Sequence, residues 1–115
     1  MSISSTPPLG EFELVVLLAV LHVVEGGGLA YGSPVRNEIE RRGERTVSRG
    51  AVYVTLDRLE DKGLLTSRLT RGSAVREHKP KRAFNVTAPG LKAVQQSLEL
   101  VARMQYGLAL ARVKT

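Results

Sequence analysis

The fold is decided by the stretch Thr46-Val-Ser-Arg-Gly-Ala-Val-Tyr-Val-Thr-Leu-Asp-Arg-Leu-Glu-Asp-Lys-Gly-Leu-Leu65. Ser48 is placed to cap a helix, because its hydroxyl can accept a hydrogen bond from a free backbone N–H two or three residues on. Gly63 can take the left-handed conformation that ends a helix. The stretch therefore predicts a helix over residues 49–62. Its buried stripe is formed by three apolar residues at helical spacing: Val52, Leu56 and Leu59.

A basic β-hairpin is predicted to follow this helix. Residues 64–69 have the apolar content of a strand, and residues 83–86 look like its partner. The segment between them is polar, contains glycine and is rich in arginine and lysine. Between Ser67 and Arg82 the sequence has one acid, Glu77, and six cations: Arg68, Arg71, Arg76, Lys79, Lys81 and Arg82. Such an excess of positive charge indicates a polyanionic partner.

Five pieces of the sequence, taken in order, resemble one known family. They are Leu9-Gly-Glu-Phe-Glu-Leu-Val-Val-Leu-Leu-Ala19, Ala30-Tyr-Gly32, Ser48-Arg-Gly-Ala-Val-Tyr53 with Leu56-Asp-Arg-Leu-Glu60, Lys62-Gly-Leu64, and Thr87-Ala-Pro-Gly90. Over roughly residues 9–108 the chain resembles the PadR family of winged-helix transcriptional regulators. The resemblance implies a bacterial or archaeal protein that binds operator DNA as a homodimer and usually represses.

The predicted fold class is mainly α with a small β-hairpin (α+β), arranged as a winged helix-turn-helix with a C-terminal dimerisation helix. We expect a flexible tail at residues 1–8, the DNA-binding domain at 9–86 and the dimerisation helix at 87–115. Within the DNA-binding domain, a first helix is expected at 9–24 and a second from Gly32 or Ser33 to residue 43. Residues 44–47 are expected to add a short strand beside the hairpin.

The last helix, capped by Thr87 and reaching about Arg112, carries an apolar seam. Its members recur in steps of three and four, which is the spacing of a coiled coil: Leu91, Val94, Leu98, Val101, Gln105 and Leu108. At about 1.5 Å per residue, a seam of this length extends beyond so small a domain. The seam therefore predicts a homodimer.

The candidate DNA contacts fall into two groups. In the recognition helix they are Ser48, Arg49, Gly50, Tyr53 and Arg58; in the wing they are Arg71, Arg76, Lys79 and Lys81. An arginine at the start of a recognition helix can donate two hydrogen bonds to guanine, and a tyrosine hydroxyl can reach a phosphate. In the alternative interpretation the arginines are solvated, Tyr53 packs half-buried, and Arg58 pairs with Asp61. The wing cations would then belong to a solvated loop.

Composition narrows the classes of function. The 115 residues are enough for one domain, and 17 Lys and Arg against 11 Asp and Glu give a net charge of +6. This balance favours nucleic acid, although an anionic membrane or simple solubility would also explain it. The absence of cysteine excludes disulfides, thiolate zinc sites and cysteine nucleophiles, and fits a cytoplasmic protein. The apolar run at residues 14–24 is too short to span a bilayer.

No catalytic residue, metal ligand or cofactor is predicted. The two histidines lie far apart, and neither a Ser/His/Asp arrangement nor an HExxH motif is present. The primary hypothesis is a dimeric repressor of an inverted-repeat operator with half-sites about one helical turn apart. The rival is a winged-helix protein-interaction module whose basic wing contacts an acidic partner without specific DNA binding.

A small-molecule inducer is implied by the resemblance alone. Family members with a short, single-helix C-terminal region can accept aromatic or drug-like compounds at the dimer interface, in some cases between tryptophans. This chain has no tryptophan, which is a departure from that pattern. Met104 and Tyr106 are the residues of the last helix suited to an inducer site, and plain interface packing is the alternative for both.

Overall fold

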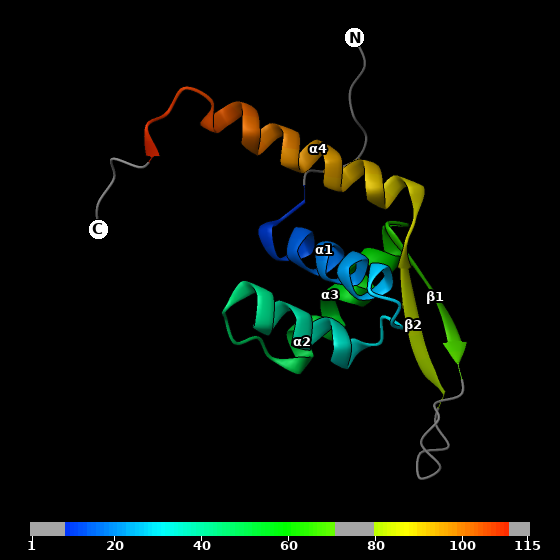
Figure 1. Cartoon of the computed structure of the whole chain (residues 1–115). Coiled ribbons are helices and arrows are strands. Elements are labelled where there is room, and N and C mark those ends of the chain that lie inside the picture. Colours follow the sequence, from blue (N-terminus) through cyan, green and yellow to red (C-terminus); the bar gives the residue numbers. More distant parts are fainter. Residues whose placement is uncertain (1–8, 71–79, 111–115) are drawn as a thin grey trace.

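The computed structural model describes residues 9–70 and 80–110. Along the chain these residues form six elements (Figure 1): α1 (Glu11–Glu25), α2 (Gly32–Gly43), α3 (Arg49–Asp61), β1 (Leu65–Thr70), β2 (Lys81–Val86) and α4 (Ala88–Gln105). The first three helices pack together, the hairpin runs along one side of them, and α4 crosses over α1. The predicted α+β winged helix-turn-helix is confirmed. The predicted tail at 1–8 lies outside the described residues.

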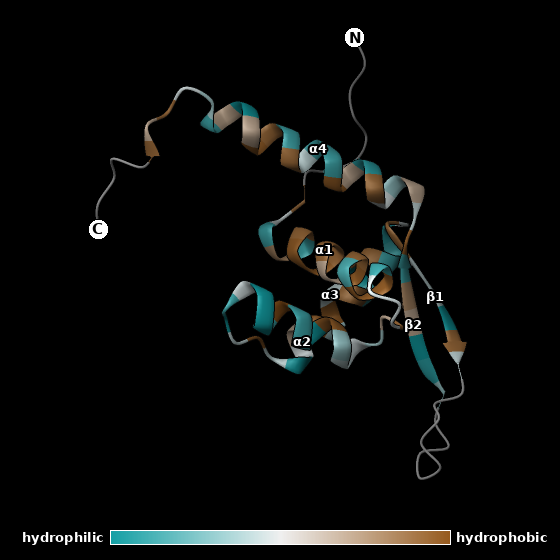
Figure 2. Ribbon diagram, viewed as in Figure 1, coloured by the Kyte–Doolittle hydropathy of each residue, from teal (hydrophilic) through white to brown (hydrophobic). Residues whose placement is uncertain are grey.

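One apolar core is shared by the helices and the hairpin. The residues that share it are fully buried or nearly so: Val16, Leu17 and Val20 of α1, Val35 and Ile39 of α2, Val52, Leu56 and Leu59 of α3, and Phe84 of β2. α1 supplies the centre of this core, and Figure 2 shows it as mostly apolar along its length. A two-stranded hairpin is marginal by itself in water. It is therefore the burial of these side chains, at about 1.5–3 kcal/mol for each large one, that stabilises the fold.

The helix boundaries follow from local capping chemistry. Ser48 Oγ accepts a hydrogen bond from the backbone N–H of Ala51 (3.0 Å) at the start of α3. Gly63 takes a positive φ of 78° just past its end. Thr87 Oγ1 accepts from the N–H of Gly90 (3.1 Å) at the start of α4. The predicted caps are confirmed. The residues of the first turn of α3, 49–51, are exposed.

The hairpin is antiparallel, with Leu65 opposite Val86 and Thr70 opposite Lys81. The prediction of a short strand at residues 44–47 is wrong, since that segment is the turn between α2 and α3. Instead, Ala30 pairs with Phe84 on the free edge of β2, and the N–H of Phe84 donates to the carbonyl of Ala30 (3.0 Å). The chain just before α2 is thereby fixed against the hairpin.

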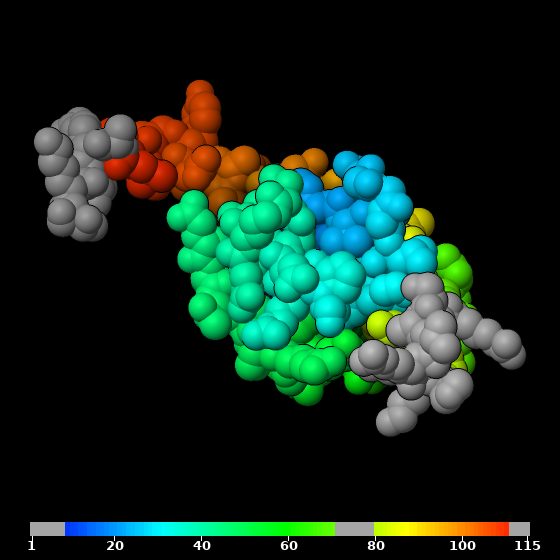
Figure 3. All heavy atoms as spheres, turned by 60° about the horizontal axis from the view of Figure 1, so that its bottom comes forward, coloured from blue at the N-terminus to red at the C-terminus, as the bar shows by residue number. Residues whose placement is uncertain are grey.

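α4 is packed on the domain only at its beginning. A side chain at Gly90 would overlap the carbonyl oxygen of Leu64, so the absence of one lets α4 lie against the start of β1. The buried residues of α4 are Gly90, Ala93 and Val94, and the rest of the helix projects past the body (Figures 1 and 3).

The prediction that this helix reaches about Arg112 is wrong. The helix ends at Gln105, and Gly107 has a φ of 86° that only glycine adopts readily. Leu108 therefore lies beyond the helix. Among the described residues, no helix is long and apolar enough to cross a membrane.

Candidate nucleic-acid interface

The turn before α3 is held by two side chains of α2. Arg36 Nε donates to the carbonyl of Val47 (2.9 Å), and the N–H of Val47 donates to Glu40 Oε2 (3.1 Å). Arg36 and Glu40 also form an ion pair with each other at 3.7 Å. Because both backbone groups of Val47 are used in this way, they are not free for a strand. This clamp fixes the position of Ser48 and so the first turn of the recognition helix.

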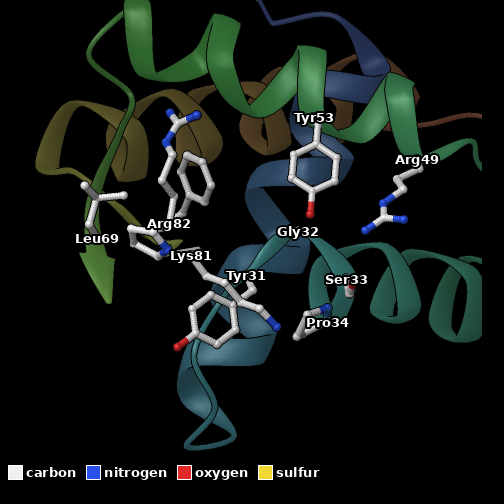
Figure 4. A pocket seen from close by; sticks show the side chains of 11 residues that line it. Tyr31, Gly32, Ser33, Pro34, Arg49, Tyr53, Leu69, Lys81 and Arg82 are labelled. Atoms are coloured by element: carbon white, nitrogen blue, oxygen red, sulfur yellow. The ribbon is translucent and has the colours of Figure 1, made fainter. Parts of the chain in front are cut away.

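The first turns of α3 bring four of the predicted residues together: Ser48, Arg49, Gly50 and Tyr53. The Arg49 guanidinium lies 5.9 Å from the centre of the Tyr53 ring. The Tyr53 ring projects from α3 toward Gly32 at the start of α2 (Figure 4), where a Cβ would overlap it. Gly32 therefore makes room for the half-exposed tyrosine. Arg58 lies about two and a half turns farther along, on another side of the helix.

An open hollow of about 640 Å³ lies beside these residues, bounded by three elements (Figure 4). The start of α2 forms its floor, α3 contributes Arg49 and Tyr53, and the hairpin contributes Lys81 and Arg82 from the other side. Three cations and no carboxylate belong to the lining that the structure describes. Figure 3 shows the α2 and α3 surfaces side by side on this face of the molecule.

The base of the wing is tied to the start of α2. The hydroxyls of Tyr31 and Thr70 are hydrogen-bonded at 2.8 Å, and Lys81 Nζ lies 5.6 Å from the centre of the Tyr31 ring. Thr70 is the last residue of β1 and Lys81 the first of β2, so both ends of the loop are held at one place. The other predicted wing contacts, Arg71, Arg76 and Lys79, lie outside the described residues.

Arg82 joins the wing to the second half of α3. Its guanidinium donates to Asp57 Oδ1 (2.7 Å) and to Glu60, and its Cζ lies 4.8 Å from the centre of the Phe84 ring. Ser67 Oγ donates to Glu60 Oε2 (2.7 Å). The Ser67 hydroxyl and Arg82 hold the pKa of Glu60 below its ordinary value, although partial burial opposes them. Arg82 thus offsets the negative charges of Asp57 and Glu60, which would otherwise repel a phosphate backbone.

This network makes stability depend on pH in the acid range. Because the pKa of Glu60 is lowered on folding, its contribution is present above the unfolded value of 4.5 and is lost as pH falls through the lower, folded value. We expect Glu60→Gln to lower Tm at pH 7 and the gap from the wild type to close below about pH 4.5. Thermal unfolding followed by circular dichroism at several pH values measures this gap, with Glu25→Gln as the control. A gap that stays constant with pH would contradict the assignment.

Other predicted residues are placed as follows. The pairing of Arg58 with Asp61 does not occur among the ion pairs of the described residues. Val94 of the seam is 5% exposed and packs in the protomer's own core, whereas Leu98 and Val101 are 47% and 54% exposed. The remaining members of the seam and of the predicted inducer site are exposed as well: Leu91, Gln105, Leu108, Met104 and Tyr106. In residues 9–70 and 80–110 no three His, Cys, Asp or Glu side chains are grouped to hold a metal.

Sequence reasoning assigned no supporting role to the side chains that hold the elements of this face in place. Tyr31, Arg36, Glu40 and Arg82 all hold a neighbouring element in place. Opposite charges at positions i and i+4 could have indicated the Arg36–Glu40 pair, though not its target at Val47. No local signal indicates the contacts of Tyr31 and Arg82, because their partners are far away in the sequence.

Comparison with known proteins agrees with this geometry. Residues 20–96 match the family described as the transcriptional regulator PadR-like family. The fold is similar to a complex structure of RosR from H. salinarum, hsRosR-S1 (TM-score 0.63, 25% identity, 90% of this chain and 82% of that chain). It is also similar to a PadR family transcriptional regulator from Eggerthella lenta (0.63, 23%, 90% and 89%) and a transcriptional regulator from Clostridium thermocellum (0.67, 19%, 89% and 92%).

No curated protein matches the sequence. The family match, by contrast, covers well over half of the chain and includes α2, α3, the hairpin and the first turns of α4. The chain therefore belongs to the PadR-like family and is a DNA-binding transcriptional regulator.

Proposed function

We propose that the protein is a sequence-specific repressor that binds an inverted-repeat operator as a homodimer. The observation that carries this proposal is the unpaired cation at the start of α3. Five arginines of the described residues are held by carboxylates: Arg36, Arg41, Arg42, Arg45 and Arg82. Within the same part of the chain, four arginines pair with no carboxylate: Arg49, Arg58, Arg68 and Arg103. Of these four, only Arg49 lines the cationic hollow. A guanidinium in that position is available to a ligand.

In the proposed complex the first turns of α3 enter the major groove. Arg49 donates two hydrogen bonds to the O6 and N7 atoms of guanine, while Ser48 and Tyr53 donate to phosphates. The positive end of the α3 dipole faces the same phosphates. Lys81, together with Arg71, Arg76 and Lys79, binds the flanking backbone or the adjacent minor groove. Arg58 is assigned a phosphate contact at the outer edge of the groove.

Gly50 gives a test in which stability and affinity move in opposite directions. A Cβ at Gly50 would meet nothing within 4 Å in the protein, so the fold does not require glycine there. Gly50→Ala should stabilise the protein by about 0.5–1 kcal/mol, since alanine is the better helix former. It should weaken operator binding by about tenfold, because the added methyl group stands between the helix and the DNA. Thermal unfolding and a binding titration measure the two effects, and unchanged affinity would contradict the close approach.

The dimer is proposed to form through α4. Beyond Val94 the large apolar side chains of α4 are 47–71% exposed in the part of the chain that the structure describes. A second copy related by a two-fold axis would cover the same patch on both chains. The functional division that we propose is a DNA-binding domain at 9–86 and a dimerisation segment at 87–115. Two recognition helices would then reach successive major grooves, and the operator would be an inverted repeat.

Repression follows most simply from occupancy of promoter DNA, which excludes the polymerase. Selection from a random DNA pool, followed by a footprint on the selected site, tests specificity and symmetry together. A reporter gene behind that site tests the direction of regulation. A symmetric protected site and a silenced reporter are expected. Binding that is weak and blind to sequence even at low salt would contradict the proposal and favour the protein-interaction module.

We further propose that an aromatic inducer binds at the end of the dimer seam, near Met104 and Tyr106. Both side chains are strongly exposed on the protomer, and Tyr106 is 88% exposed. A flat aromatic compound offers the apolar surface that would cover them. Titration with a panel of such compounds should lower operator affinity for the wild type and have a smaller effect on Tyr106→Ala. If no compound changes the affinity, or if both proteins respond equally, the site is refuted.

A further inference from the structure

Val54 is an exposed apolar residue on the recognition helix. It is 54% exposed, and it is not among the partly buried side chains that pack against the core. Its neighbours two positions away, Val52 and Leu56, are completely buried. At about 100° per residue, a step of two places Val54 on the side of α3 opposite the buried stripe. Its isopropyl group therefore faces away from the protein.

The fold does not account for a valine at this position. A β-branched side chain loses rotamer freedom in a helix, and at an exposed site no packing compensates for that loss. Gly50, one turn earlier on the same face, is a second poor helix former with open space around it. Gly50 and Val54 thus both lower the helix propensity of α3, and both lie on its exposed face. A bound partner is the natural source of compensation.

The residues around Val54 on α3 indicate the chemistry of that partner. Arg49 and Tyr53 lie to one side of it on α3, and Arg58 lies to the other. Arg58 and Tyr53 are both exposed. Val54 is thus an apolar residue between two exposed arginines. The acids of the same face, Asp57 and Asp61, lie toward the end of the helix, and Asp57 is paired with Arg82 at 2.7 Å. A ligand that fits is anionic where it meets the two arginines and presents a small apolar group to Val54.

The major groove of DNA has this arrangement. Phosphates line its edges, and the C5-methyl group of thymine is the apolar group that base pairs present there. We infer that Val54 is a specificity-determining residue that packs on a thymine methyl group and selects thymine at one position of each half-site. This inference rests on the proposed function, because it requires α3 to lie in the major groove.

The test uses the operator selected by the wild type and copies of it in which single thymines are replaced by uracil, which lacks the methyl group. We expect one symmetric pair of replacements to weaken wild-type binding by about fourfold per half-site, which corresponds to one buried carbon at about 0.8 kcal/mol. Val54→Ala should bind the thymine and uracil forms equally at that pair. It should stay folded, because alanine is the better helix former. Val24→Ala, the same change at an exposed site of α1, should keep the wild-type preference.

The outcomes distinguish a failure of this inference from a failure of the proposed function. A thymine preference that disappears with Val54→Ala and remains with Val24→Ala supports the contact. If the wild type selects an operator but Val54→Ala keeps the same discrimination at every position, the inference is overturned and the proposed function stands. If the wild type selects no sequence at all, both are overturned.

Discussion

Arg49→Ala is expected to weaken binding to the selected operator by about 10- to 100-fold and to remove the preference for guanine at one position of each half-site. The physical reason is that a bidentate arginine contact recognises one base, and the base pair loses its partner when the guanidinium is removed. Binding to unrelated DNA should fall much less, because phosphate contacts from the wing remain. The measurement is the ratio of the affinity for the operator to the affinity for a scrambled duplex.

Arg41→Ala is the matched control for this prediction. Arg41 is an exposed arginine of α2 whose Nη2 donates to Glu38 Oε1 at 3.0 Å. An ion pair of this exposed kind contributes between zero and about 1 kcal/mol, so stability should change little. The operator-to-scrambled ratio should be that of the wild type. Equal loss of specificity in both variants would show that specificity depends on the total positive charge and not on the position of Arg49.

The double change Leu98→Glu and Val101→Glu should convert the dimer to a monomer and lower operator affinity by more than about 100-fold. Both side chains are exposed on the protomer, so a glutamate at either site meets water in the monomer. In the dimer the same carboxylates would be buried against each other, which is strongly unfavourable. Without the link, each half-site is bound separately and the avidity of the pair is lost. Light scattering measures the mass, and a titration measures the affinity.

Lys92→Glu changes the net charge by the same amount on another face of α4, and it should leave the mass of the dimer unchanged. Circular dichroism should show a folded domain for both variants, because the buried residues of α4 are Gly90, Ala93 and Val94. A double variant that remains a dimer would refute the α4 interface. A monomer that keeps the wild-type affinity would refute the two-fold mode of binding.

The elements of this fold could be predicted because their boundaries depend on local chemistry. Ser48 and Thr87 accept hydrogen bonds from backbone groups three residues away, so their effect is visible in a short window of sequence. The end of α4 had a local signal as well, since Gly107 adopts the left-handed conformation in which glycine ends helices.

The partner of an apolar stripe could not be predicted in the same way. Val94 packs on its own core and Leu98 is exposed one turn later, yet both fit the same spacing. A period of three and four residues shows which side of a helix is apolar, and it does not show which surface covers that side. That information depends on how far the domain extends beneath α4.

The candidate interface also combines features that depend on local sequence with features that depend on tertiary packing. The exposed positions of Arg49 and Tyr53 could be predicted from their place in the recognition helix. The hydrogen bond between Tyr31 and Thr70 spans 39 residues, and that between Arg82 and Asp57 spans 25. Such contacts form only after α2, α3 and the hairpin have packed together. They determine where the wing lies relative to the helix, so the shape of the cationic hollow could be known only from the structure.

The central claim is that the start of α3, and not its end, lies in the major groove. Because the chain has no cysteine, a single cysteine can carry a tethered iron–EDTA group that cleaves nearby DNA. The exposed positions Ala51 and Asp61 are ten residues, or about 15 Å, apart along the helix. With Ala51→Cys we predict two symmetric clusters of cleavage inside the operator, about one helical turn apart, and with Asp61→Cys much weaker cleavage. Stronger cleavage from position 61, or none from either, would contradict the account.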